Sequence, residues 1–131
     1  MKLNVMFTIA AVYGILIGLP LLLAGPAVLA VGGMLTESVP DSVSMTVRFF
    51  GVTLLGLGSI AWLVRNADAS KARDGIALGF TVYFALHGLT SLYGAFTDTS
   101  TSGHWFMAAL QGLIAVGFYM ARKASMSAQT S

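Results

Sequence analysis

The sequence predicts an all-α fold, a four-transmembrane-helix antiparallel bundle with a short outer interfacial helix after the first span. Its composition is 56% apolar and 9% charged, against roughly 45–50% and about 25% in soluble domains, and the mean hydropathy is +0.83. In the stretch 48–96, two apolar runs flank the charged segment RNADASKARD. Such a stretch is typical of a transmembrane hairpin with a cytoplasmic turn. We therefore expect residues 1–131 to form a single integral membrane domain.

Charge and residue content exclude several classes of protein. The net charge of +2 comes from only seven Lys and Arg, which does not indicate nucleic-acid binding. The chain has no Cys, so it can form no disulfide, thiolate nucleophile or thiol metal ligand. Phosphate loops and metal motifs such as HExxH do not occur. Hydroxyl groups in the apolar runs lack a His–carboxylate partner at a suitable spacing. The sequence thus predicts that the protein is not an enzyme.

The first apolar run, residues 3–34, is longer than one span requires, because about 20 residues cross the hydrocarbon layer. Pro20 and the Gly-Pro pair at 25–26 are the expected interruptions, since proline removes a backbone donor and disfavours helix at the residue before it. We expect a helix at about 4–24 and the short interfacial helix at about 26–35.

A secretory signal peptide is an alternative interpretation of this first run, with Val28, Leu29 and Ala30 as the cleavage site. The single cation before it, Lys2, and the length of the apolar stretch favour retention instead. The remaining spans are expected at about 44–64, 74–96 and 104–122. The small polar residues after Lys123 are expected to fray.

Cations in the short connecting segments predict the orientation. One side receives six of them and the other only Arg48, a clear positive-inside bias. The six are Lys2, Arg65, Lys71, Arg73, Arg122 and Lys123. We therefore expect both termini in the cytoplasm, the segments 25–44 and 97–104 outside, and the protein in a bacterial inner (cytoplasmic) membrane.

Small residues recur at helical spacing in every span. In lipid, helices associate by close backbone approach, which small side chains permit. The stripes therefore predict either contacts within the bundle or contacts with another subunit. They are Ala10, Gly14 and Gly18 in the first span, Gly51 and Gly58 in the second, Gly75 and Gly79 in the third, and Ala108 and Gly112 in the fourth.

Three polar residues within the spans are candidate site residues, because polar groups are unfavourable in hydrocarbon. They are Arg48, His87 and Gln111, all in the outer half of the bundle. Tyr83, Thr90 and Ser91 lie three or four residues from His87, and Tyr13 lies near mid-depth in the first span.

Two interpretations of these residues stay open. In one, Arg48, Tyr83, His87 and Gln111 form a ligand-binding pocket roofed by the segment 25–44. In the other, which we favour, Arg48 reaches the interface and pairs with Asp41 or Glu37. His87 and Gln111 then form interhelical hydrogen bonds.

His87 and His104 raise the question of a metal or a haem-like pigment, since neutral imidazole is a common axial ligand. His104 is expected at the interface and His87 deeper, so a shared metal is not expected. The sequence requires no cofactor; a tetrapyrrole or pigment at His87 alone remains an alternative.

Three segments carry a resemblance: RFFGVTLLGLGSIAWLVRNA, ARDGIALG and GHWFMAALQGLIAVGFYMARK. Residues 48–123 resemble small bacterial four-helix membrane proteins of unknown function, the DUF4345/DoxX-like set. The resemblance implies a fold and no activity, and His87 does not belong to its pattern.

The leading hypothesis for function is a non-enzymatic accessory or scaffold subunit of a larger inner-membrane complex. Its partners would be the lipid bilayer and other membrane subunits, or further copies of the chain bound through the Gly/Ala stripes. The alternative is a binder or carrier of a lipid, quinone or pigment in the outer polar pocket. A membrane enzyme has the least support, because no carboxylate pair occurs within a span.

Overall fold

The computed structural model describes residues 2–33, 40–97 and 102–130, which form five helices and, within these ranges, no strand. Four of the helices are long and apolar enough to cross a membrane, which confirms the predicted all-α four-helix bundle. The helices are α1 (Leu3–Ala24), α2 (Pro26–Val31), α3 (Asp41–Val64), α4 (Lys71–Thr97) and α5 (Gly103–Thr130).

Four of the predicted helix ends were wrong, and one of them is the start of α3, at Asp41 instead of about 44. Helix α4 begins at Lys71 instead of about 74, because Ser70 caps it: the Ser70 hydroxyl accepts a hydrogen bond from the Arg73 backbone N–H at 3.2 Å. Helix α5 continues to Thr130, so the segment after Lys123 is helical where fraying was expected.

The interfacial helix α2 ends at Val31 instead of about 35. The Gly32-Gly33 pair follows it, and Gly33 has a φ of +67°, a conformation that favours glycine. The Gly33 carbonyl accepts a hydrogen bond from the Gly103 N–H at 3.1 Å, which ties the end of α2 to the start of α5. The connections 34–39 and 98–101, including Glu37, lie outside the described residues.

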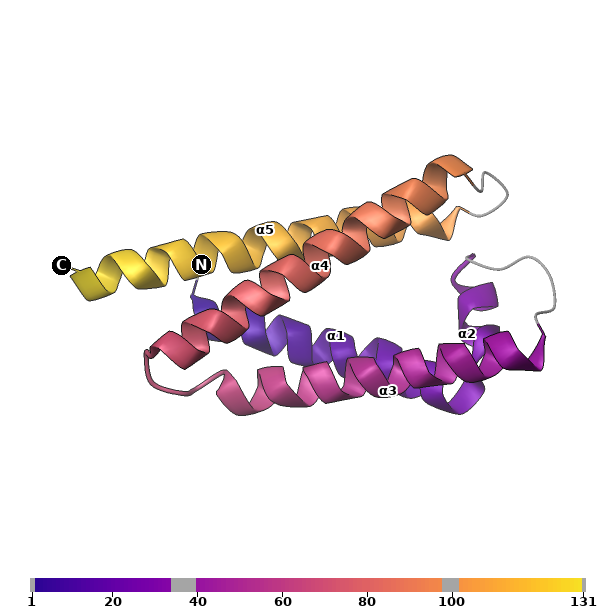
Figure 1. Cartoon of the computed structure of the whole chain (residues 1–131), viewed down its shortest axis with the longest axis horizontal. Coiled ribbons are helices and arrows are strands. Elements are labelled where there is room, and N and C mark those ends of the chain that lie inside the picture. Colours follow the sequence, from indigo (N-terminus) through magenta and orange to yellow (C-terminus); the bar gives the residue numbers. More distant parts are fainter. Residues whose placement is uncertain (1, 34–39, 98–101, 131) are drawn as a thin grey trace.

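The long helices form two layers, one of α1 with α3 and one of α4 with α5 (Figure 1). Both termini and the turn between α3 and α4 lie at one end of the molecule, and α2 lies at the other (Figure 1). We call the first the basic end, because it carries Lys2, the cations of the 65–74 segment, and Arg122 with Lys123. We call the second the α2 end.

Glycines bring α1 and α3 into backbone contact. A Cβ atom at Gly14 would lie 2.6 Å from the Leu54 carbonyl oxygen and 2.8 Å from the Gly58 Cα. One at Gly18 would lie 2.8 Å from the Gly51 carbonyl oxygen. Only glycine fits at such distances, so the predicted stripes of these two helices do form a helix–helix interface.

In the layer of α4 and α5, only some of the glycines pack against a neighbouring helix. Gly88 packs on α5, where an added Cβ would lie 3.3 Å from the Gly112 backbone nitrogen and 3.5 Å from the Ala108 carbonyl oxygen. Gly75 and Gly79 are exposed, and an added Cβ at either would meet nothing within 4 Å. Of the two alternatives predicted for the stripes, contact within the bundle therefore does not hold for Gly75 and Gly79.

Aromatic rings join the two layers. Phe7 of α1 contacts Phe80 of α4 and Phe118 of α5 edge-on, at centroid distances of 6.0 and 5.4 Å. Tyr13 contacts Phe84 in the same way at 5.4 Å. Edge-to-face pairs of this kind are each worth about 0.5–1.5 kcal/mol beyond the area they bury. The layers are therefore held together by side chains at the centre of the bundle.

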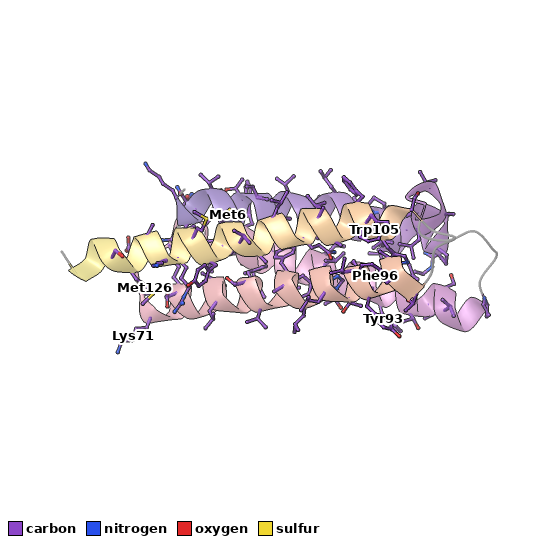
Figure 2. The ribbon with its side chains drawn as sticks, turned by 90° about the horizontal axis from the view of Figure 1, so that it is seen from above. Met6, Lys71, Tyr93, Phe96, Trp105 and Met126 are labelled. Atoms are coloured by element: carbon purple, nitrogen blue, oxygen red, sulfur yellow. The ribbon has the colours of Figure 1, made fainter. Side chains whose placement is uncertain are left out.

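The outer surface is apolar and suits lipid. Leu16, Leu63 and Leu113 are 65%, 78% and 73% exposed, and an exterior of this kind marks a membrane-facing surface. Tyr93, Phe96 and Trp105 gather toward the α2 end, while Lys71 and Met126 lie toward the basic end (Figure 2). Exposed aromatic side chains and clustered cations both mark the ends of membrane-spanning helices.

Candidate functional site

Gln111 lies at the centre of a polar network in the membrane-spanning part of the bundle. It lies on α5 and is 1% exposed, and two other helices, α1 and α4, bring partners to its amide. The amide nitrogen donates to the Tyr13 hydroxyl of α1 at 3.1 Å. The amide oxygen accepts from the Ser91 hydroxyl of α4 at 3.2 Å. A buried amide that is bonded in this way fixes the relative positions of α1, α4 and α5.

His87 completes the network. Its Nδ1 lies 3.1 Å from the Gln111 amide nitrogen. Because that nitrogen only donates, Nδ1 accepts, and the imidazole is neutral with its proton on Nε2. One face of the ring stacks on Phe50 of α3 at 5.2 Å, and Tyr83 packs against it at 5.0 Å. All four long helices thus contribute to the surroundings of the network.

Tyr83 contributes its ring to the network but not its hydroxyl. The hydroxyl oxygen is buried and has no hydrogen-bond partner among the described residues. A buried hydroxyl without a partner is unfavourable by about 1–3 kcal/mol. It therefore has unused capacity to bind a polar ligand atom, as does the His87 Nε2–H, for which Gln111 is no partner.

Arg48 bonds to the backbone of α1 and not to the other residues of the predicted pocket. Its Nη1 donates to the carbonyl oxygens of Leu22 and Leu23, at 2.6 and 2.8 Å. These carbonyls belong to the last turn of α1, where helix carbonyls lack intrahelical partners and the helix dipole is negative. Arg48 is therefore a cap on α1. The expected pairing with Asp41 or Glu37 involves side chains outside those the structure describes.

The four residues predicted for the pocket thus separate into two groups. His87 and Gln111 bond directly and Tyr83 adjoins them, whereas Arg48 binds the backbone of α1. The favoured expectation of an interhelical hydrogen bond between His87 and Gln111 is confirmed by this geometry. Thr90 does not join them, because its hydroxyl donates to the Leu86 carbonyl oxygen on its own helix.

The two histidines occupy different places. The His104 ring packs against Gly94, two turns along α4 from His87. Within the described parts of the chain, no group of three His, Asp or Glu side chains lies close enough to hold a metal ion. A pigment at His87 alone would have to use Nε2, since Nδ1 faces Gln111.

Two contacts in the structure were not predicted from the sequence. Phe50 stacks on His87, and only the packing of α3 against α4 brings these residues together. At the basic end, Arg122 of α5 forms an ion pair with Asp74 of α4 at 2.8 Å. The signal for this pair was an acidic residue at the start of one span and a cation at the end of the next, because antiparallel neighbours bring those ends together.

Together the fold and the network define a multi-pass α-helical membrane protein with a hydrogen-bonded polar core. No family model, curated protein or solved structure matches the chain.

Proposed function

We propose that this protein is a non-enzymatic accessory subunit that docks another membrane protein through an apolar groove on α4 and α5. The observation that carries the proposal is the groove itself, about 550 Å³ in volume. Alanine and glycine residues form much of its lining, among them Ala85, Ala109 and Gly112, and Trp105 lies near the α2 end of it. We call it the α4/α5 groove.

The groove has the chemistry that a transmembrane helix requires. Lipid provides no hydrophobic drive between helices, so partners associate where small residues allow close dispersion contact. A Cβ at Gly112 would meet nothing within 4 Å, which means that the floor of the groove is open to a partner side chain. Gly75 and Gly79 leave a second part of α4 equally open.

The polar network supports a structural role for the interior. Gln111 uses its amide on Tyr13, His87 and Ser91, and Arg48 is bonded to the end of α1. These groups are engaged in holding the fold. The outer surface is then the more favourable place for recognition.

We propose further that the protein lies in a bacterial inner membrane with its basic end in the cytoplasm. Six cations gather at that end. The other end has one, Arg48, which is bonded to backbone. The positive-inside bias is therefore strong. The resemblance of residues 48–123 to small bacterial four-helix membrane proteins supports the same location. A reporter fused after Lys123 should be active only in the cytoplasm, and one inserted at Ser102 only outside; the reverse pattern would contradict the orientation.

Photocrosslinking in native membranes tests the docking role. A photoreactive phenylalanine at Ala109, which lines the α4/α5 groove, should give one discrete adduct with another protein. The same residue at Leu16, an exposed position on α1, should give none. An adduct of twice the chain's own mass would assign the groove to self-association, and no adduct at Ala109 would contradict docking there.

A second candidate function is the binding of a lipid, quinone or pigment head group at the polar network. The unpartnered Tyr83 hydroxyl favours it, because a ligand carbonyl could accept its hydrogen bond. Extraction of the purified protein should then yield a stoichiometric small molecule that Tyr83→Phe no longer retains. Equal yields from the wild type and Tyr83→Phe would remove this candidate.

A further inference from the structure

A second cavity lies at the basic end, about 270 Å³ in volume, between the start of α1, the first turn of α4 and the last turns of α5. It was not predictable from the sequence, because one wall is the part of α5 beyond Lys123, where fraying was expected. Its lining residues are Lys2, Leu3, Arg73, Ala121, Ala124 and Ser125. We call it the basic cavity.

Two cations of this cavity have unused donors. Arg73 directs Nε and Nη2 to the carbonyl oxygens of Val64 and Arg65, at 3.3 and 2.9 Å. These bonds hold the guanidinium in place at the end of α3 and leave Nη1 without an acceptor among the described residues. The Lys2 ammonium also has no described partner. The cavity therefore presents one positioned donor, Arg73 Nη1, beside the exposed Lys2 ammonium.

Nearby carboxylates do not neutralise these cations. Asp74 lies beside Arg73 in a small adjoining hollow, but its carboxylate is bonded to Arg122 at 2.8 Å. Asp68 is exposed in the turn between α3 and α4. Six cations face two carboxylates at this end of the chain, so the cavity is in a positive field. An anion would be drawn to it.

The remaining lining residues indicate what the anion is attached to. Leu3, Ala121 and Ala124 are apolar, and the Ser125 hydroxyl adds a neutral donor. The volume is just below the ~300–1,000 Å³ of sites for whole small molecules, which suits a head group better than a complete lipid. Basic pockets between transmembrane helices at the membrane surface are suited to anionic head groups.

We propose that the basic cavity binds a phosphate-ester anion, carried by the head group of an anionic phospholipid. Arg73 Nη1 and Lys2 contact the phosphate oxygens, and Ser125 donates to the head group. The acyl chains remain in the bilayer beside the apolar lining. This site is separate from the α4/α5 groove and does not depend on the docking role.

Lipid binding to the delipidated full chain in detergent tests the proposal. Native mass spectrometry would measure the binding of short-chain phosphatidylglycerol, of phosphatidylcholine with the same chains, and of inorganic phosphate. Phosphatidylglycerol should bind in preference to both. Equal binding of the two lipids would overturn the anionic site. Binding of inorganic phosphate equal to that of phosphatidylglycerol would overturn the lipid head group and assign the site to a soluble ligand.

Charge-matched variants separate the cavity from the general field of the basic end. Lys2→Gln should weaken phosphatidylglycerol binding about fivefold, the usual contribution of one cation near a membrane surface. Lys71→Gln removes the same charge outside the cavity and should change it little. Ala124→Leu should weaken binding with no change in charge, because it fills the cavity.

Equal weakening by Lys2→Gln and Lys71→Gln would overturn the proposal in favour of diffuse attraction. The helical circular dichroism of each variant without lipid should match that of the wild type. This is expected because Lys2 makes no described side-chain contact and Ala124 is exposed.

Discussion

A methyl group at Gly14 should destabilise the bundle strongly, although Gly→Ala is among the smallest substitutions. The new Cβ would lie 2.6 Å from the Leu54 carbonyl oxygen and 2.8 Å from the Gly58 Cα, where ordinary contacts begin at 3.4 Å. Both atoms belong to backbone, so neither can rotate away. Helices α1 and α3 would have to separate by roughly 0.8 Å at this point.

Such a separation affects the whole glycine interface. A gap of about 0.5–1 Å already removes a quarter to a half of the dispersion energy of each contact, and the Gly18–Gly51 approach lies one turn along. Overpacking of this kind is unfavourable by about 1–3 kcal/mol. We expect Gly14→Ala to lower the free energy of unfolding by that amount.

Gly79→Ala is the matched control. Its Cβ would meet nothing within 4 Å, and alanine favours helix over glycine by up to ~1 kcal/mol. Unfolding in mixed micelles with increasing sodium dodecyl sulfate, followed by tryptophan fluorescence, would measure both variants. Equal stability of Gly14→Ala and Gly79→Ala would refute the glycine contact between α1 and α3.

Three further predictions concern polar contacts. Arg48→Met should lower stability in the same assay by about 1–3 kcal/mol, because two carbonyls at the end of α1 lose their donor; an unchanged midpoint would show that they bind water instead. Gln111→Leu should lower the stability by a similar amount. His87→Gln should lower it less, because glutamine keeps a hydrogen-bonding group beside the Gln111 amide. Equal losses of stability in the two variants would contradict the network. A double-mutant cycle with Asp74→Asn and Arg122→Gln should give a coupling of about 0.5–1 kcal/mol that falls with added salt, because the side chains are 27% and 23% exposed.

The spans were predictable because membrane crossing is encoded in the length and hydropathy of each run. The spacing of Gly14, Gly18, Gly51 and Gly58 identified faces that could pack closely, but the structure was needed to show that these faces meet each other. Gly75 and Gly79, which pack on no helix of this chain, show the limit of such patterns. A stripe identifies a face that can approach another helix closely, but not which helix occupies it.

The site was only partly predictable for a related reason. His87 and Gln111 stand out because amide and imidazole groups are unfavourable in hydrocarbon, and the structure brings them together. The partners of Arg48 did not stand out, since they are backbone carbonyls that every residue carries. The basic cavity depends on the continuation of α5 beyond Lys123, where composition suggested fraying.

The assembly state in native membranes tests the docking role of the α4/α5 groove most directly. Gly112 in the groove and Gly56 on α3 are matched, because an added Cβ at either would meet nothing within 4 Å. After mild solubilisation, native electrophoresis should place the wild type and Gly56→Leu in the same assembly, larger than the chain alone, and Gly112→Leu at the mass of the free subunit. Migration of all three at one mass would contradict docking through the groove.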